Sequence, residues 1–172
     1  MENVLRQHPW TDDELVSAGF HYYERKKQLV MAARLPEALA PLQIHYPLET
    51  VIAEAGDVIC IDPGEVVRSS LLEYDHWSVK YEIFVATYHN WEAAGWQPTV
   101  QMRFLMERGC KPYFKMQGAW SKHLDQAMWI QSLESPDPIE VPAGMWLMIG
   151  PKGEPWHVED DKFRERYIIE DD

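Results

Sequence analysis

An internal repeat constrains the fold of this chain more than any other feature of its sequence. An Ala-Gly pair precedes a short apolar run, a Pro turn and a Gly-Glu pair at residues 55–65, and the same order recurs at residues 143–154. Glycine permits the positive φ that tight turns require, so both segments predict the same path of strand and turn. One copy is too small to bury a good core alone, and we therefore expect the two copies to pack together.

An aromatic pair follows each copy of the repeat at the same internal spacing. The two segments are Asp75-x-Trp77-x-x-x-Tyr81 and Asp161-x-Phe163-x-x-x-Tyr167. We expect each Asp to cap a short helix, because a carboxylate at the N-cap accepts from free backbone N–H groups. Side chains at i and i+4 share one helix face, so each aromatic pair is predicted to close over the preceding strands.

These observations predict a single domain over residues 1–172, of α+β class, strand-dominated and small, with two pseudo-repeats and short helices. The first pseudo-repeat covers about residues 20–87 and the second about residues 111–170. Apolar residues make up 46% of the chain, which is enough for a real core at this length.

Local signals give further elements. Thr11 and Glu14 have the capping-box spacing, which predicts a short helix that starts after Thr11. Aromatic and β-branched residues at 20–23 and 29–33 flank a charged bend and predict a hairpin. The remaining predictions are a helix over residues 74–81 that leads into residues 82–87, and a strand over residues 99–106.

The two cysteines, Cys60 and Cys110, form neither a disulfide framework nor a zinc pattern. Cys60 lies inside an apolar strand and is predicted to be a buried small hydrophobe. Cys110 follows Gly109 near a turn and is a candidate for an accessible thiol.

The formal net charge of −12, from 28 acidic and 16 basic residues, argues against binding of duplex nucleic acid. Solubility is one explanation of this charge. The other is a surface that binds a basic protein, including mimicry of nucleic acid by an inhibitor.

The N-terminal segment, residues 1–9, has neither a basic start nor an apolar signal core, and no apolar stretch approaches the length of a membrane span. We expect a cytoplasmic protein without membrane association.

The second copy resembles a known family. Its residues are Ala143-Gly144-Met145-Trp146, Gly150-Pro151-Lys152-Gly153-Glu154 and the Phe163–Tyr167 pair. In this order they resemble the PGDYG family, small phage and bacterial proteins of unknown function. The resemblance covers about residues 111–170 well and residues 23–84 weakly, and the Pro-Gly-Asp-Tyr-Gly turn itself is altered in both copies. It implies a compact α+β or β-rich unit in a phage-related context and no particular activity.

Catalytic motifs are absent from the sequence. The seven His residues show no metal-binding spacing, and no Ser lies in a nucleophile elbow. We therefore expect no catalytic residues, no metal and no cofactor. Glu65 and Glu154 occupy equivalent repeat positions and suggest either an acid/base or cation site or, as we prefer, two turn-closing carboxylates.

Aromatic residues are the most suggestive chemical feature, with 8 Trp, 8 Tyr and 5 Phe. Exposed Trp and Tyr are typical binding anchors, and proximity to Pro suggests exposure of Trp96 and Trp156. The candidate binding residues are Trp96, Trp156, His157, Glu65, Glu154, Trp77, Tyr81 and Tyr167.

The sequence thus favours a non-enzymatic binding or inhibitory accessory module of phage type that engages a basic protein partner through an acidic, aromatic surface. One alternative is a small-molecule or nucleotide-binding protein with a cleft between repeats or subunits. A second alternative is a hydrolase with a carboxylate and a His at the repeat junction. Formation of a homodimer stays open, because twofold dimers are the commonest assemblies.

Overall fold

The computed structural model of the chain describes residues 3–115 and 117–169. Within these residues it contains 14 strands in four sheets and four short α-helices, so the chain is a strand-dominated α+β protein. The described chain forms two compact units. Unit 1 comprises residues 3–26, 43–52 and 117–169, and unit 2 comprises residues 27–42 and 53–115. Residue 170, the predicted end of the second repeat, lies outside the described residues.

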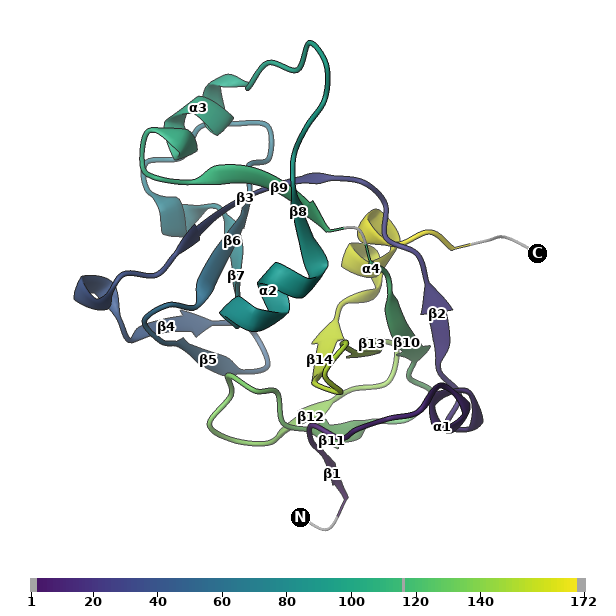
Figure 1. Cartoon of the computed structure of the whole chain (residues 1–172). Helices are drawn as coiled ribbons and strands as arrows, with labels where there is room; N and C mark the ends of the chain where they lie inside the picture. The colour runs from purple at the N-terminus through teal and green to yellow at the C-terminus, as the bar shows by residue number, and fades with distance from the viewer. Residues whose placement is uncertain (1–2, 116, 170–172) are drawn as a thin grey trace. The chain divides into compact units, whose positions relative to one another are not determined.

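Unit 1 contains a four-stranded sheet of order β14-β13-β10-β2 and a three-stranded sheet of order β1-β11-β12 (Figure 1). The strands are β1 (Val4–Leu5), β2 (His21–Tyr23), β10 (Ala119–His123), β11 (Met128–Ile130), β12 (Ile139–Val141), β13 (Trp146–Ile149) and β14 (Pro155–Val158). The helices are α1 (Asp12–Ser17) and α4 (Asp160–Arg166).

Unit 2 contains one five-stranded sheet of order β7-β6-β3-β9-β8. Its strands are β3 (Leu29–Arg34), β6 (Val58–Asp62), β7 (Asp75–Val79), β8 (Tyr88–Asn90) and β9 (Lys111–Lys115). Its helices are α2 (Tyr81–Thr87), α3 (Val100–Met106) and the 3₁₀ turns Glu37–Leu39 and Leu71–Glu73. Strands β4 (Leu42–His45) and β5 (Thr50–Ala53) pair with each other, and residues 43–52 of this hairpin belong to unit 1.

The two units have the same central architecture. In unit 2, β6 pairs antiparallel with β3 and β7, and in unit 1, β13 pairs antiparallel with β10 and β14. The connecting turns also match. Leu35 donates to the Asp57 carbonyl at 2.7 Å and accepts from Gly56 at 2.9 Å. In unit 1, Leu124 makes the same pair of bonds with Met145 and Gly144, at 2.9 and 2.8 Å.

Glycine is required in both turns. Gly56 has a φ of 88° and Gly144 a φ of 93°, a left-handed conformation that side chains with a Cβ rarely adopt. The Ala-Gly pair that recurs in the sequence therefore corresponds to a turn that both units contain.

A seven-residue helix follows the strand pair in each unit, and an aromatic pair holds it. In unit 2, Phe84 of α2 stacks on Tyr88, with ring centroids 4.6 Å apart. In unit 1, Phe163 of α4 stacks on Tyr167 at 4.8 Å. The structurally equivalent pairs are thus Phe84–Tyr88 and Phe163–Tyr167.

The predicted equivalence of Trp77 and Tyr81 with the second aromatic pair is wrong. Trp77 lies on strand β7, so the predicted helix over residues 74–81 is also wrong, and Asp75 opens this strand instead of capping a helix. In α4 the N-cap is Glu159, with Asp161 in the first turn.

The segment predicted as a strand over residues 99–106 is a helix. It forms α3, which Thr99 caps by accepting from the Met102 N–H at 3.3 Å. Burial of one helix face overrides the weak intrinsic preference for strand in this segment. Residues 82–87 lie in α2, where Ile83, Phe84 and Thr87 are buried at helical spacing.

The predicted hairpin between residues 20–23 and 29–33 is wrong as well. Strand β2 pairs with β10, and β3 pairs with β6 and β9. The first strand of each predicted pseudo-repeat therefore belongs to the unit that contains the rest of the other pseudo-repeat's sheet: β2 pairs within unit 1, and β9 pairs within unit 2. The predicted helix after Thr11 is confirmed, and its capping box with Glu14 is present.

Both faces of the central strand are buried in unit 1. Leu147 and Ile149 of β13 belong to one core cluster, and Trp146 and Met148 belong to a second cluster that includes Phe163. Alternate side chains of a strand point to opposite faces, so a continuous apolar run is the sequence signature of such a strand.

The predictions for the cysteines had different outcomes. Cys60 is fully buried on β6, as predicted. Cys110 is only 3% exposed, so the prediction of an accessible thiol is wrong, and burial raises the pKa of this thiol above its ordinary value.

Candidate functional site

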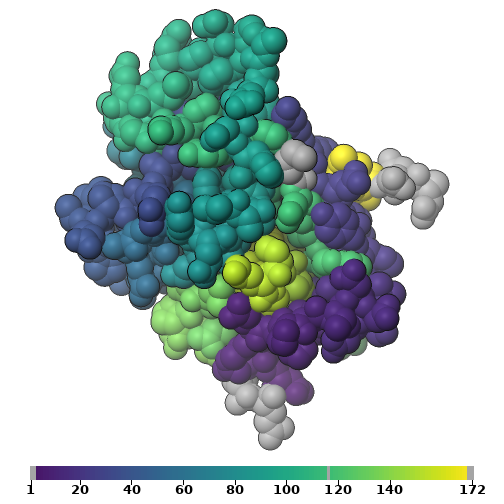
Figure 2. All heavy atoms as spheres, in the orientation of Figure 1, coloured from purple at the N-terminus to yellow at the C-terminus, as the bar shows by residue number. Residues whose placement is uncertain are grey.

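A surface hollow of about 370 Å³ lies in unit 1 between two loops. The loop between β4 and β5 forms one wall, and the segment before β12 forms the other. The backbone N–H of Ile52 donates to the carbonyl of Glu134 at 2.9 Å and joins the two walls. The loop of residues 131–138 lies at the surface in light green in Figure 2. The lining residues are Tyr46, Pro47, Leu48, Glu49, Thr50, Ser135, Pro136, Asp137 and Ile139.

Local hydrogen bonds fix both walls. Tyr46 N–H donates to the Glu49 carbonyl at 2.8 Å and closes the β4–β5 turn, in which Pro47 restricts the backbone. On the opposite wall, the Ser135 hydroxyl donates to the Asp137 carbonyl at 2.9 Å. The side chains at these positions are therefore carried on short, internally bonded turns.

The carboxyl group of Glu49 is the most unusual group of the hollow. Its side chain is 6% exposed. The Ser132 hydroxyl donates to Oε1 at 3.3 Å, whereas Oε2 has no hydrogen-bond partner among the described residues. Burial raises the pKa of Glu49, and the bond from Ser132 offsets part of this effect. A buried carboxylate oxygen without a donor is costly to stability and marks Glu49 as a candidate functional group.

His157 lies next to this carboxyl group. Its Nδ1 is 3.7 Å from Glu49 Oε2, and its side chain is 14% exposed. The register of β14, in which His157 is opposite Leu147, brings the ring to this place. Burial lowers the pKa of His157. The distance would suit an ion pair. Because burial disfavours the charged form of both groups, we regard Glu49 and His157 as neighbours whose protonation states influence each other, and not as a permanent ion pair.

The hollow has a clear electrostatic preference. Asp137 adds a second, exposed carboxyl group, and none of the residues that line the hollow is Lys, Arg or His. Such a surface attracts a positively charged group and repels phosphate. Among residues 3–115 and 117–169, no three His, Cys, Asp or Glu side chains lie together in a way that could hold a metal ion.

The predicted site residues are divided equally between the units. Trp156, His157, Glu154 and Tyr167 belong to unit 1, and Trp96, Glu65, Trp77 and Tyr81 belong to unit 2. Of these eight predicted residues, His157 contacts the Glu49 carboxyl group, at 3.7 Å from Nδ1 to Oε2.

The aromatic candidates mostly serve packing. Trp156 and Trp77 are half-buried against the cores of their own units, and Tyr167 is fully buried. Trp96 is half-buried in the loop between β8 and α3, so neither Trp96 nor Trp156 is as exposed as predicted. Tyr81 is 46% exposed at the start of α2.

Glu65 and Glu154 have different surroundings in spite of their equivalent sequence positions. Glu154 is buried, and its Oε1 accepts from the Lys152 N–H at 2.9 Å within the turn between β13 and β14. Glu65 is exposed in the longer loop after β6. The carboxylate of Glu154 thus closes a turn.

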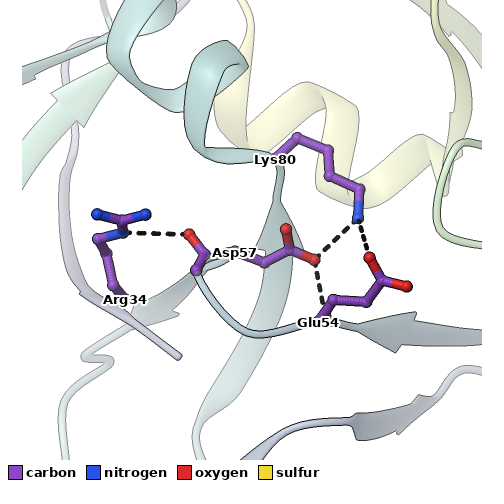
Figure 3. A network of polar contacts seen from close by, with 5 residues as sticks. Arg34, Glu54, Asp57 and Lys80 are labelled. Atoms are coloured by element: carbon purple, nitrogen blue, oxygen red, sulfur yellow. Dashed lines mark hydrogen bonds and ion pairs between the residues drawn. The ribbon is translucent and has the colours of Figure 1, made fainter. Parts of the chain in front are cut away.

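A polar network in unit 2 joins residues 54–57 to Lys80, directly before α2 (Figure 3). Lys80 Nζ lies 3.0 Å from Asp57 Oδ2 and 3.9 Å from Glu54 Oε2. The same Asp57 oxygen accepts from the Glu54 N–H at 2.8 Å. Arg34 donates to the Gly56 carbonyl at 3.2 Å and covers the Tyr81 ring at 3.9 Å. These bonds tie the turn at residues 54–57 to the start of α2, which is a structural role.

Sequence reasoning missed Glu49, because it lies in a Pro-rich segment without a motif and its partners are 83 and 108 residues away. It also missed a signal that was present. Trp-x-Val-x-x-x-x-Phe-x-x-x-Tyr occurs at residues 77–88 and again at residues 156–167, and this is the register in which the units match.

Comparison of the chain with protein families, with curated proteins and with solved structures finds no match. The resemblance to the PGDYG family therefore stays a prediction. Among the described residues, no helix has the length and hydropathy that a membrane-spanning segment requires.

Proposed function

We propose that this chain is a non-enzymatic binding protein that receives a positively charged side chain of a basic protein partner in the hollow of unit 1. The observation that carries the proposal is the pair of carboxyl groups, Glu49 and Asp137, on opposite walls of a hollow without a lining cation. A Lys or Arg side chain presents the complementary charge on an apolar stem.

The net charge of the whole chain supports this choice. A charge of −12 accelerates encounter with basic partners over long range, and the hollow gives a place where one cation can be held. Two unit charges about 4 Å apart attract by about 1 kcal/mol in water and by about 4 kcal/mol near a protein surface. Even one basic side chain can thus contribute substantially to binding.

The geometry favours binding over hydrolysis. A serine nucleophile must reach its substrate, but Ser132, whose hydroxyl donates to the carboxyl group of Glu49, is only 8% exposed. The phage-related, inhibitory role in a cytoplasm is part of the proposal, and it derives from the family resemblance and the charge alone.

Titration with a capped hexalysine peptide tests the proposal. We expect binding at about 50 mM salt that weakens strongly at about 300 mM salt, and no binding of a hexaglutamate peptide. Asp137→Asn should weaken hexalysine binding about five-fold, as expected for the loss of one partly exposed charge contact.

Asp13→Asn is the matched control. Asp13 is exposed on α1, outside the lining of the hollow, and its substitution changes the net charge by the same amount. Equal weakening by both variants, or no hexalysine binding by the wild type, would contradict the proposal.

A small organic cation is the second candidate ligand, because the volume of about 370 Å³ is within the range of small-molecule sites. A nucleotide, which the sequence suggested as an alternative ligand, is less suitable, because two carboxyl groups repel its phosphates. Titration with putrescine in place of hexalysine distinguishes the two: saturable putrescine binding that Asp137→Asn weakens favours the small cation.

A further inference from the structure

The Glu49 carboxyl group has a feature that simple charge attraction does not explain. A site that only needed negative charge could use exposed carboxylates such as Asp137, which remain hydrated. Glu49 instead is almost fully buried, has one oxygen without a donor, and lies 3.7 Å from an imidazole nitrogen. Burial of this kind makes the charge state of a carboxyl group dependent on its neighbours.

We propose that cation binding in the hollow is coupled to loss of the Glu49 proton, so that the partner is bound in neutral solution and released on acidification. The inference rests on the proposed function and adds its regulation. The overall step is Glu49–COOH plus a bound cation giving Glu49–COO⁻ with the cation, and one proton leaves.

The proton leaves to solvent. His157 is the nearest base, but an imidazolium ion at this position would repel the incoming cation. Because burial raises the pKa of Glu49, the protonated form extends to higher pH in the free protein, and a neighbouring cation reverses this effect.

Both groups give the same direction of pH dependence. As the pH falls, Glu49 is protonated and loses its attraction for the cation. Acidification also charges His157, and its imidazolium ion then repels the cation. Binding therefore weakens on acidification for two reasons that reinforce each other.

Other ionisable groups surround the hollow and need separation from Glu49. Asp137 lies on the opposite wall, the Nδ1 of His45 on β4 is 3.1 Å from the Thr50 hydroxyl, and Glu134 contributes its backbone carbonyl. Variants of Glu49 and Ser132 test the Glu49 proton directly, because the Ser132 hydroxyl donates to this carboxyl group at 3.3 Å.

Calorimetric titration with hexalysine at several pH values from about pH 5 to about pH 8, each in two buffers that hold that pH and differ in their enthalpy of ionisation, measures the number of protons released. Wild type should release protons on binding, with up to one from Glu49 and a further contribution from His157 at pH values where it is charged. Glu49→Gln should release fewer protons than wild type and show a flatter pH profile. Ser132→Ala should move the midpoint to higher pH, because its hydroxyl stabilises the ionised form.

The outcomes separate the two proposals. Hexalysine binding without proton release, or equal pH profiles for wild type and Glu49→Gln, overturns the coupling alone. Absence of binding at every pH overturns the proposed function and the coupling together. If Glu49→Gln fails to fold by circular dichroism, the direction of the Ser132→Ala shift decides, since a purely structural role of Ser132 would not move the midpoint.

Discussion

Replacement of the two equivalent phenylalanines should destabilise the units by different amounts. Phe163 is fully buried and touches three rings: Trp146 at 3.7 Å and Tyr167 at 4.8 Å, both stacked, and Tyr23 at 5.2 Å, edge to face. Phe84 touches two rings, Tyr88 and Tyr113.

The expected free energies follow from these contacts. Each aromatic pair contributes about 0.5–1.5 kcal/mol beyond the burial of its area. Leucine conserves much of the volume, so the substitution removes mainly the ring contacts. We expect Phe163→Leu to cost about 3 kcal/mol and Phe84→Leu about 2 kcal/mol. The difference of about 1 kcal/mol is the contribution of the Trp146 stack.

Native-state hydrogen exchange is the suitable assay, because two units with separate cores need not unfold in one step. Phe163→Leu should reduce the protection of amides in β13, and Phe84→Leu should reduce that of amides in β6. Urea unfolding of the whole chain gives the overall loss. Equal costs of the two substitutions, or a larger cost for Phe84→Leu, would refute the ring-contact reasoning.

Two further predictions concern buried charge. Lys80→Met should lower the free energy of unfolding by about 2–4 kcal/mol, because the Asp57 carboxylate stays buried without its ammonium partner. In a double-mutant cycle measured by urea unfolding, addition of Asp57→Asn should recover part of this loss. Strictly additive effects of the two substitutions would argue against an interaction between Lys80 and Asp57. Glu49→Gln should stabilise the protein at about pH 8 but not at about pH 4 in thermal unfolding. Burial raises the pKa of Glu49 in the folded state above 4.5, so its ionisation costs stability only as the pH rises through the folded pKa. A Glu49→Gln variant that is less stable than wild type at high pH would show that the carboxylate is held by donors.

The sequence predicted those elements whose signal is local. The capping box at Thr11 and the turns at Gly56 and Gly144 depend on residues a few positions apart, and the backbone geometry of these segments leaves few alternatives. The burial of Cys60 follows in the same way from the apolar run around it.

The register of the repeat was also present in the sequence, although the wrong pair of aromatic residues was matched. Loop length explains the error. The loop after β6 runs from residue 63 to residue 74, but the loop after β13 only from residue 150 to residue 154. An alignment anchored on the Gly turn therefore shifts the second half of the repeat, and matching the Trp, Val, Phe and Tyr positions corrects it.

The tertiary structure alone decided the pairing of strands and the site. Strand β2 pairs with β10, almost 100 residues away, and β3 pairs with β9, because burial of both sheet faces requires partners that no local signal specifies. Glu49, Ser132 and His157 come from three distant segments, and nothing in their own neighbourhoods marks them. Local sequence fixes backbone conformation through nearby hydrogen bonds and φ preferences, whereas the proximity of distant side chains depends on the packing of the whole unit.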